Sequence, residues 1–438
     1  MNKKLTLILT FVVAFFATAI AETVVDGETA FKLKASRDGS LYNQGEKIEF
    51  VFEATKNGQP VKNLEVRSTL SKDGVAPFLS SKAKTDENGK IVINSNGLNE
   101  PGVVRCQVWL KNPDTNKEVT VMAGAGVDVY SIKMSRDLPK DFKSYWRKQK
   151  KMLSKIPMNT EMVSTKCYNE NVELFDIKVD SYKGLLTGYY ARPKGAKPKS
   201  CPAIIFPHGA GVRSSNMHSA IGYAAKGFIA LDYNAHGIPN GKPDEYYKKL
   251  AETELKGYPH FGSNDKDESF FKVLFLRTLR ALEFLMAQPE WDGKILIASG
   301  TSQGGGQALV AGGICNKVSL VVANVPAICD HTGVLANKRT GGWPKLVKFD
   351  KDGNYDEKVL EASAYVDAAN FASFIKCKSV LSTGLRDNVC APSSVFAAYS
   401  NINVKDKTII INEESSHSVP KETYKKCYNI ILEHANIK

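Results

Sequence analysis

An apolar run that ends in a glycine-flanked serine constrains the fold of this chain more than any other feature. Residues 294–304 read Lys-Ile-Leu-Ile-Ala-Ser-Gly-Thr-Ser-Gln-Gly, and residues 305–312 continue with mostly glycine and apolar residues. This pattern predicts a buried strand, a sharp turn and a helix, and the glycines permit the tight geometry. Ser302 would stand exposed on the turn as a nucleophile, and the backbone N–H of Gln303 would form half of an oxyanion hole.

Two later apolar segments lead to the base and the orienting acid that a serine nucleophile needs. Residues 379–384 predict a strand before Asp387, and residues 408–411 predict a strand before His417. His417 is the expected general base and acid, and Asp387 is expected to orient and stabilise its imidazolium. The chain order serine, aspartate, histidine is that of the α/β-hydrolase fold, a mostly parallel sheet flanked by helices.

An earlier strand leads to the expected second oxyanion donor. Residues 203–206 are apolar, and the turn after them contains His208-Gly-Ala210-Gly. A His-Gly-x-Gly turn at this place supplies a backbone N–H to the oxyanion, here expected from Ala210. His208 itself is expected to lie beneath the turn in a structural role.

Other residues compete for these roles. His236 and His331 also follow apolar strands, but they come too early in the chain for the base of this fold. Asp330 is the rival of Asp387. In the plainest alternative, His417 is a surface-loop histidine and Asp387 caps a strand.

Four segments together resemble one family of enzymes. They are residues 138–146 (Leu-Pro-Lys-Asp-Phe-Lys-Ser-Tyr-Trp), 302–306 (Ser-Gln-Gly-Gly-Gly), 324–330 (Asn-Val-Pro-Ala-Ile-Cys-Asp) and 384–393, which begins Gly-Leu-Arg-Asp. Over most of residues 138–438 the chain resembles the acetyl xylan esterase and cephalosporin C deacetylase group of carbohydrate esterases.

The resemblance implies hydrolysis of small acyl esters on carbohydrates, chiefly acetyl groups, as on acetylated xylan. Ser302, Asp387 and His417 would form the triad, and the N–H groups of Ala210 and Gln303 the oxyanion hole. No cofactor is implied. The alternatives are a feruloyl-type or other carboxylesterase and, less favoured, a serine peptidase, whose large propeller domain would not fit before residue 130.

The chain departs from the family pattern at three places. Ala210 stands where an aromatic residue is usual, residues 234–236 (Asn-Ala-His) replace Arg-Gly-Gln, and Ser418 replaces a glutamate after the histidine. These differences leave open which substrate the chain acts on and whether it forms the ring-like homo-oligomer of the family.

The N-terminus predicts export. Two lysines, an apolar run over residues 5–20 and Ala-Ile-Ala at 19–21 are typical of a secretory signal peptide over residues 1–21. Cleavage would leave a periplasmic or extracellular protein without a membrane anchor, whose partner is an acylated carbohydrate.

The rest of the chain predicts two domains. Residues 22–130 contain alternating segments such as 47–54 and 104–110, which predict an all-β, immunoglobulin-like domain that either binds carbohydrate or is structural. Asn-Gly at 88–89 predicts a hairpin turn. Residues 131–438 form the α/β-hydrolase domain.

Three further elements are expected in that domain. They are an amphipathic helix within residues 140–155, an edge hairpin formed by residues 172–179 and 185–191, and a polar insertion over 238–268. The insertion is either a lid or a plain surface segment.

Charge and cysteine content bear on two further kinds of function, nucleic-acid binding and metal binding. The net charge of +13 lies mainly after residue 130, and nucleic-acid binding is not expected of an exported enzyme. The eight cysteines show no CxxC pair, so no metal site is predicted, and buried free thiols are the common outcome.

Overall fold

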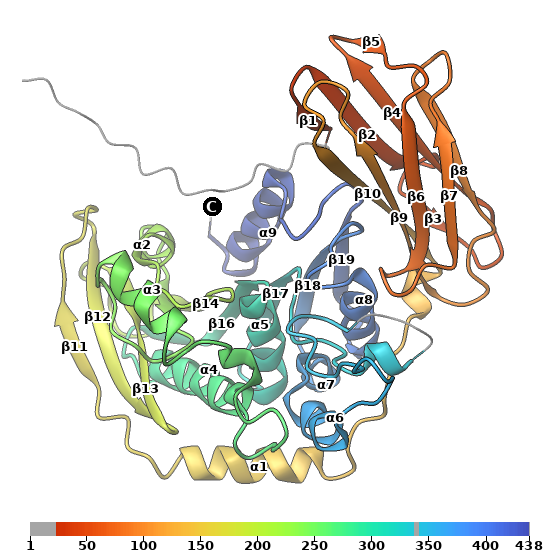
Figure 1. Ribbon diagram of the computed structural model, residues 1–438. Helices are drawn as coiled ribbons and strands as arrows, with labels where there is room; N and C mark the ends of the chain where they lie inside the picture. Colours follow the sequence, from red (N-terminus) through yellow and green to blue (C-terminus); the bar gives the residue numbers. More distant parts are fainter. Residues whose placement is uncertain (1–22, 337–340, 438) are drawn as a thin grey trace, which may run out of the picture.

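The chain folds into a β-sandwich and a larger α/β part (Figure 1). The computed structural model describes residues 23–336 and 341–437. The predicted signal peptide lies outside these residues, and the predicted domain boundaries stay predictions. Among the described residues, no helix has the length and apolar character that a membrane span requires.

The sandwich consists of two sheets that share one apolar core. One sheet has the order β1-β2-β4-β5, with β8 paired to β4, and the other has the order β3-β10-β9-β6-β7. Along β4 buried and more exposed residues alternate, because successive side chains point to opposite faces. The immunoglobulin-like classification stays a prediction. The strands are β1 (Val24–Asp26), β2 (Thr29–Ala35), β3 (Leu41–Tyr42), β4 (Ile48–Lys56), β5 (Gln59–Pro60), β6 (Glu65–Lys72), β7 (Leu79–Lys84), β8 (Lys90–Ser95), β9 (Gly102–Lys111) and β10 (Glu118–Val127).

The hairpin predicted at Asn88-Gly89 is wrong. The flanking strands lie in opposite sheets, since β7 pairs with β6 and β8 pairs with β4. Gly89 does have a positive φ of 72°. Its carbonyl accepts a hydrogen bond of 2.9 Å from the N–H of Ala54. The glycine therefore joins two sheets rather than two paired strands, a difference that the local sequence does not record.

The α/β part is built on a nine-stranded sheet with the order β11-β12-β13-β15-β14-β16-β17-β18-β19. The pairs from β15 through β14 to β19 are parallel, and the antiparallel pairs, which join β11, β12, β13 and β15, lie toward the β11 edge. The edge hairpin predicted from the sequence is confirmed, with β11 as one more strand outside it. The strands are β11 (Glu161–Ser164), β12 (Val172–Ser181), β13 (Gly184–Pro193), β14 (Cys201–Pro207), β15 (Ile229–Tyr233), β16 (Trp291–Thr301), β17 (Leu320–Asn324), β18 (Lys378–Gly384) and β19 (Lys407–Asn412).

Helices cover both faces of this sheet, which confirms the predicted mixed α/β class. Residues such as Ile205 and Val321 face a core with α1, α4, α5 and α7, whereas Ile204 and Val322 face α2 and α9. The amphipathic helix is confirmed as α1. The α-helices are α1 (Phe142–Leu153), α2 (Met217–Ala224), α3 (Asp244–Glu252), α4 (Phe270–Met286), α5 (Gln303–Ile314), α6 (Glu357–Ser363), α7 (Ala368–Ala372), α8 (Pro392–Asn401) and α9 (Lys421–His434), and the short 3₁₀ helices are η1 (Val129–Ser131), η2 (Tyr258–His260), η3 (Gly333–Leu335) and η4 (Ala364–Val366).

The sandwich packs against the end of the α/β part, beside β19 and α8 (Figure 1). A small apolar core joins the two and includes Val103 of β9, Leu385 after β18 and Phe396 of α8. The two parts therefore share buried surface next to the segments that carry Asp387 and His417.

Candidate active site

Ser302 occupies a strained turn between β16 and α5. Its φ and ψ angles are 59° and −123°, a region that non-glycine residues rarely adopt at a cost of about 1–3 kcal/mol. The turn is held by three backbone hydrogen bonds, one from Ser302 N–H to Asn324 and two to the Ser302 carbonyl from Gly306 and Ala327. These bonds hold the Ser302 backbone in its strained conformation. The turn therefore presents the Ser302 side chain at the carboxyl edge of the sheet.

The glycine after Gln303 is required by close packing. A Cβ at Gly304 would overlap the carbonyl oxygen of Pro207, and a Cβ at Gly300 would overlap the carbonyl of Gly304. Strand β14, the turn and helix α5 can approach this closely only without side chains. This packing is the physical reason for the glycines that flank the serine.

The three residues predicted from different strand ends meet in one chain of hydrogen bonds. His417 Nε2 lies 2.8 Å from Ser302 Oγ, and His417 Nδ1 lies 2.8 Å from Asp387 Oδ2. Asp387 follows β18, and His417 lies between β19 and α9. The structure therefore brings Ser302, His417 and Asp387 together.

The surroundings of Asp387 select one form of His417. The carboxylate is fully buried, and its Oδ1 accepts hydrogen bonds of 2.8 Å from the N–H groups of both Val389 and Cys390. These two bonds fix the position of the carboxylate. Oδ2 then accepts the proton-bearing Nδ1 of His417, which leaves the lone pair of Nε2 directed at the Ser302 hydroxyl.

The side chains of His208 and Arg213 hold the turn that follows β14 by hydrogen bonds to its backbone carbonyls. His208 Nε2 accepts a hydrogen bond from Ala235 N–H, so its Nδ1 carries the proton and donates to the Gly209 carbonyl at 2.7 Å. Burial lowers the pKa of His208 to about 3, so the ring is neutral. Arg213 also donates to the carbonyls of Gly209 and Ala210, at 3.1 and 3.0 Å.

These bonds orient the peptide that carries the Ala210 N–H. In a trans peptide the C=O and N–H point in opposite directions, so the fixed Gly209 carbonyl turns the Ala210 N–H away from His208. Gln303 is the first residue of α5, where an N–H has no acceptor within the helix. Both predicted oxyanion donors thus lie on backbone that flanks Ser302.

A cavity of about 410 Å³ opens over Ser302. Its lining combines the Ser302 turn, the Ala210 turn and two apolar side chains, which suits a small acyl group. The lining residues are Gly209, Ala210, Arg213, Thr301, Ser302, Trp343, Val389 and His417.

The polar insertion at 238–268 supports the Ala210 turn. It contains α3 and η2, and the hydroxyl of Tyr258 accepts a hydrogen bond of 3.1 Å from Gly211 N–H and donates to Gln303 Oε1 at 3.0 Å. Sequence reasoning missed the roles of Tyr258 and Arg213. Only Arg213, a cation two residues after the His-Gly-Ala-Gly turn, carried a local signal.

The rival residues have other hydrogen-bond partners or surroundings. His236 has its Nε2 on the Gly211 carbonyl and its ring 4.5 Å from that of Tyr258, and burial lowers its pKa to about 4. Asp330 accepts hydrogen bonds from the backbone and hydroxyl of Ser135. His331 is fully buried, with a pKa lowered to about 4 by desolvation.

One group of metal-ligating side chains is found in the part of the chain that the structure describes. It consists of Asp387, Cys390 and His417, whose ligand atoms lie within 4.8 Å of one another. Asp387 and His417 already bond to each other, and burial raises the pKa of the Cys390 thiol well above its usual range. Two of the three donors are thus already hydrogen-bonded to each other. All eight cysteines are free.

Comparisons with known proteins agree with this architecture. The family model for acetyl xylan esterase (AXE1) matches residues 127–433. The acetyl esterase Axe7A of Xylanibacter ruminicola is 31% identical over 421 residues, which cover 94% of this chain and 93% of that protein.

Solved structures similar to this one include two acetyl xylan esterases. That from Paenibacillus sp. R4 is 22% identical with a TM-score of 0.59, over 70% of this chain and 98% of that one. Acetyl xylan esterase 1 from Thermoanaerobacterium sp. JW/SL YS485 is 25% identical with a TM-score of 0.57, over 70% and 97%.

Proposed function

This chain belongs to the acetyl xylan esterase family and is a carboxylic ester hydrolase, and we propose that it removes acetyl groups through a Ser302–His417–Asp387 triad. The observation that carries the proposal is the unbroken hydrogen-bond chain, with 2.8 Å from Asp387 to His417 and 2.8 Å from His417 to Ser302. Acetylated xylan or xylo-oligosaccharides are the proposed substrates.

The chemistry follows from these positions. His417 Nε2 takes the proton of the Ser302 hydroxyl as Oγ attacks the ester carbonyl, and Asp387 stabilises the imidazolium. The oxyanion of the tetrahedral intermediate accepts hydrogen bonds from the backbone N–H groups of Ala210 and Gln303. His417 then gives its proton to the departing sugar hydroxyl, which leaves an acetyl-enzyme. Water, activated by His417, repeats the steps and releases acetate.

A second candidate is an esterase for larger acyl groups such as feruloyl. The small side chain of Ala210 favours this candidate. Ala210 lines the cavity, and a larger side chain at this position would fill part of it. Trp343 and Val389 line the same cavity and suit an apolar acyl group. The family membership favours acetyl.

The proposal is tested with the purified protein on acetylated xylan, methyl ferulate and a proline-containing peptide. We expect acetate release from the first, slower or no reaction of the second, and none of the third. Ser302→Ala should lower turnover by up to about 10⁶-fold, because the nucleophile is lost. The matched control is Ser299→Ala, a buried serine of β16, the strand that leads into the Ser302 turn. A Ser302→Ala variant that kept a tenth of the activity would contradict the triad.

We further propose that the enzyme is exported after cleavage at residue 21. The basic and apolar N-terminal pattern supports this proposal. An intact mass of the exported protein that begins at Glu22 is the expected result, and retention of residues 1–21 in that protein would contradict it.

A further inference from the structure

The β-sandwich touches the backbone of the Asp387 segment directly. Leu385 is fully buried in the apolar core between the two parts, together with Val103 of β9. On the neighbouring strand β10, a Cβ at Gly124 would overlap the carbonyl oxygen of Leu385. The sandwich surface is thus shaped to receive the segment that leads into Asp387.

Arg105 of β9 makes the contact with Asp387 itself. Its Nη2 donates a hydrogen bond of 2.7 Å to the backbone carbonyl of Asp387, 282 positions away in the chain. The side chain is 7% exposed, and burial lowers its pKa although Asp73 and Asp387 attract the cation. Gly74 leaves room for the guanidinium, since a Cβ there would overlap Arg105 Nη1.

Two further bonds join the sandwich to the segments around the triad. Arg386, next to Asp387, donates from Nη2 to the carbonyl of Leu33 in β2 at 3.0 Å. Ser40 donates to Glu413 of the segment that carries His417, at 2.8 Å. Between the two catalytic segments, Arg386 N–H donates to the carbonyl of Ser415 at 3.1 Å.

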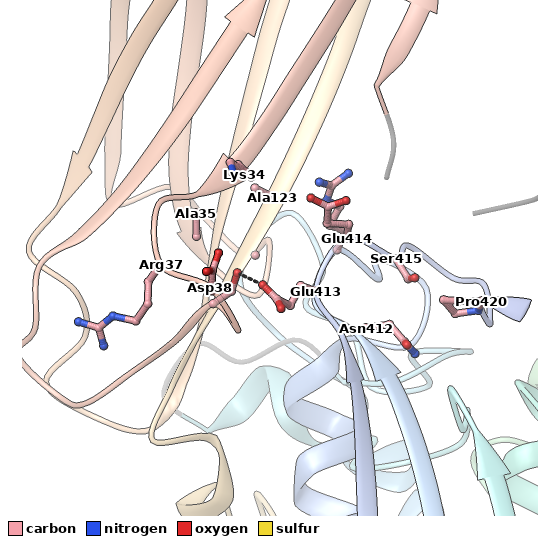
Figure 2. A pocket seen from close by; sticks show the side chains of 13 residues that line it. Lys34, Ala35, Arg37, Asp38, Ala123, Asn412, Glu413, Glu414, Ser415 and Pro420 are labelled. Carbon is pink, nitrogen blue, oxygen red and sulfur yellow. Dashed lines mark hydrogen bonds between the residues drawn. The ribbon is translucent and has the colours of Figure 1, made fainter. Parts of the chain in front are cut away.

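These bonds surround a cavity of about 390 Å³ at the interface. Figure 2 shows Glu413, Glu414 and Ser415 on one side of it and Lys34 and Arg37 of the sandwich on the other. Both segments that supply the acid and the base of the triad are therefore contacted by the sandwich, whereas the backbone bonds that hold the Ser302 turn come from Asn324, Gly306 and Ala327 of the α/β part.

We propose that Arg105 of the sandwich is a positioning residue for Asp387. This inference rests on the proposed triad. A charged donor on the Asp387 carbonyl fixes the backbone from which the carboxylate reaches His417, and charge-assisted hydrogen bonds are the stronger ones. Misplacement by about 1 Å can lower a rate on the order of a hundredfold. The N-terminal part then acts on turnover rather than on carbohydrate binding.

The test compares Arg105→Met with Arg105→Lys in the full chain, with p-nitrophenyl acetate as substrate. We expect Arg105→Met to lower kcat on the order of tenfold to a hundredfold while KM stays within about twofold. Arg105→Lys keeps a charged donor and should recover part of the loss. The matched control is Arg67→Met, because Arg67 lies on the same sheet but pairs with Glu118 at the surface, and it should keep the wild-type kcat.

Two more measurements separate positioning from general destabilisation. Gly124→Ala should displace the same segment without removing the arginine and lower kcat in the same way, and it carries the test if Arg105→Met does not fold. The downfield proton signal of His417 Nδ1–H should shift or broaden in Arg105→Met and Gly124→Ala, and stay unchanged in Arg67→Met.

The outcomes are distinct. Wild-type kcat in both Arg105→Met and Gly124→Ala, with Ser302→Ala inactive, would overturn the positioning role and leave the proposed function intact. A raised KM on acetylated xylan with unchanged kcat on the small ester would also overturn it, in favour of a binding role. A wild-type protein without acetyl esterase activity would refute the proposed function itself.

Discussion

Replacing Asp387 by asparagine should reverse the proton arrangement of His417. In the native site, Oδ1 of Asp387 accepts hydrogen bonds from the N–H groups of Val389 and Cys390, and Oδ2 accepts one from His417 Nδ1–H. Asparagine has only one oxygen. If that oxygen still accepts the hydrogen bonds from the two backbone N–H groups, the NH₂ group of the asparagine faces His417 Nδ1. The imidazole ring must then carry its proton on Nε2, toward Ser302. The base is then lost without any loss of packing.

The magnitude follows from the alternative orientation of the amide. To restore Nδ1–H, the amide would have to turn its NH₂ group toward Val389 and Cys390 and leave two buried N–H groups without an acceptor. Each costs about 1–3 kcal/mol, so the productive form lies about 2–6 kcal/mol higher. This range corresponds to a loss of about 30-fold to 10⁴-fold in kcat. A loss of about 10⁴-fold is known for the same exchange in a serine-protease triad.

The assay is hydrolysis of p-nitrophenyl acetate, with melting temperature as the measure of folding. The matched control is Asp367→Asn, since Asp367 is also a buried carboxylate that accepts backbone N–H groups, from Asp330, His331 and Ala369. Asp367 caps the N-terminus of α7, and His417 bonds to Asp387 instead, so the control should lose stability but keep most of its kcat. An Asp387→Asn variant within fivefold of wild-type kcat would refute the tautomer argument.

Two further predictions concern stability. Burial raises the pKa of Asp232 from 3.8 to about 8, so its contribution to stability is present below pH 4 and is lost as the pH rises through 8. Relative to Asp232→Asn, the wild type should lose on the order of 3 kcal/mol between pH 5 and pH 8 in urea unfolding, and a pH-independent difference would contradict this. Gly304→Ala should cost about 1–3 kcal/mol and lower kcat, because its Cβ meets the backbone of Pro207, whereas Gly222→Ala, with open space around it, should not destabilise. Equal melting temperatures of the two glycine variants would refute the packing argument.

The amino-acid sequence was sufficient for the residues that stand at the ends of apolar strands. Parallel strands place their carboxyl ends on one edge of a sheet, so Ser302, Asp387 and His417 could be expected together from their order alone. The same reasoning failed at Asn88-Gly89, because a turn signal records local backbone conformation and not which strands pair beyond it. The polar insertion is visible in the sequence as a segment, but the sequence does not decide its role.

The sequence by itself determined the apolar strands, the glycines of the serine turn and the chain order of Ser302, Asp387 and His417, because these depend on short-range periodicity and backbone sterics. Only the tertiary structure decided that Tyr258 supports the turn of Ala210 and that Arg105 donates to Asp387. A hydrogen bond between residues 282 positions apart leaves no periodic signal in the chain. It exists because two separately patterned cores pack together and bring that arginine to that carbonyl.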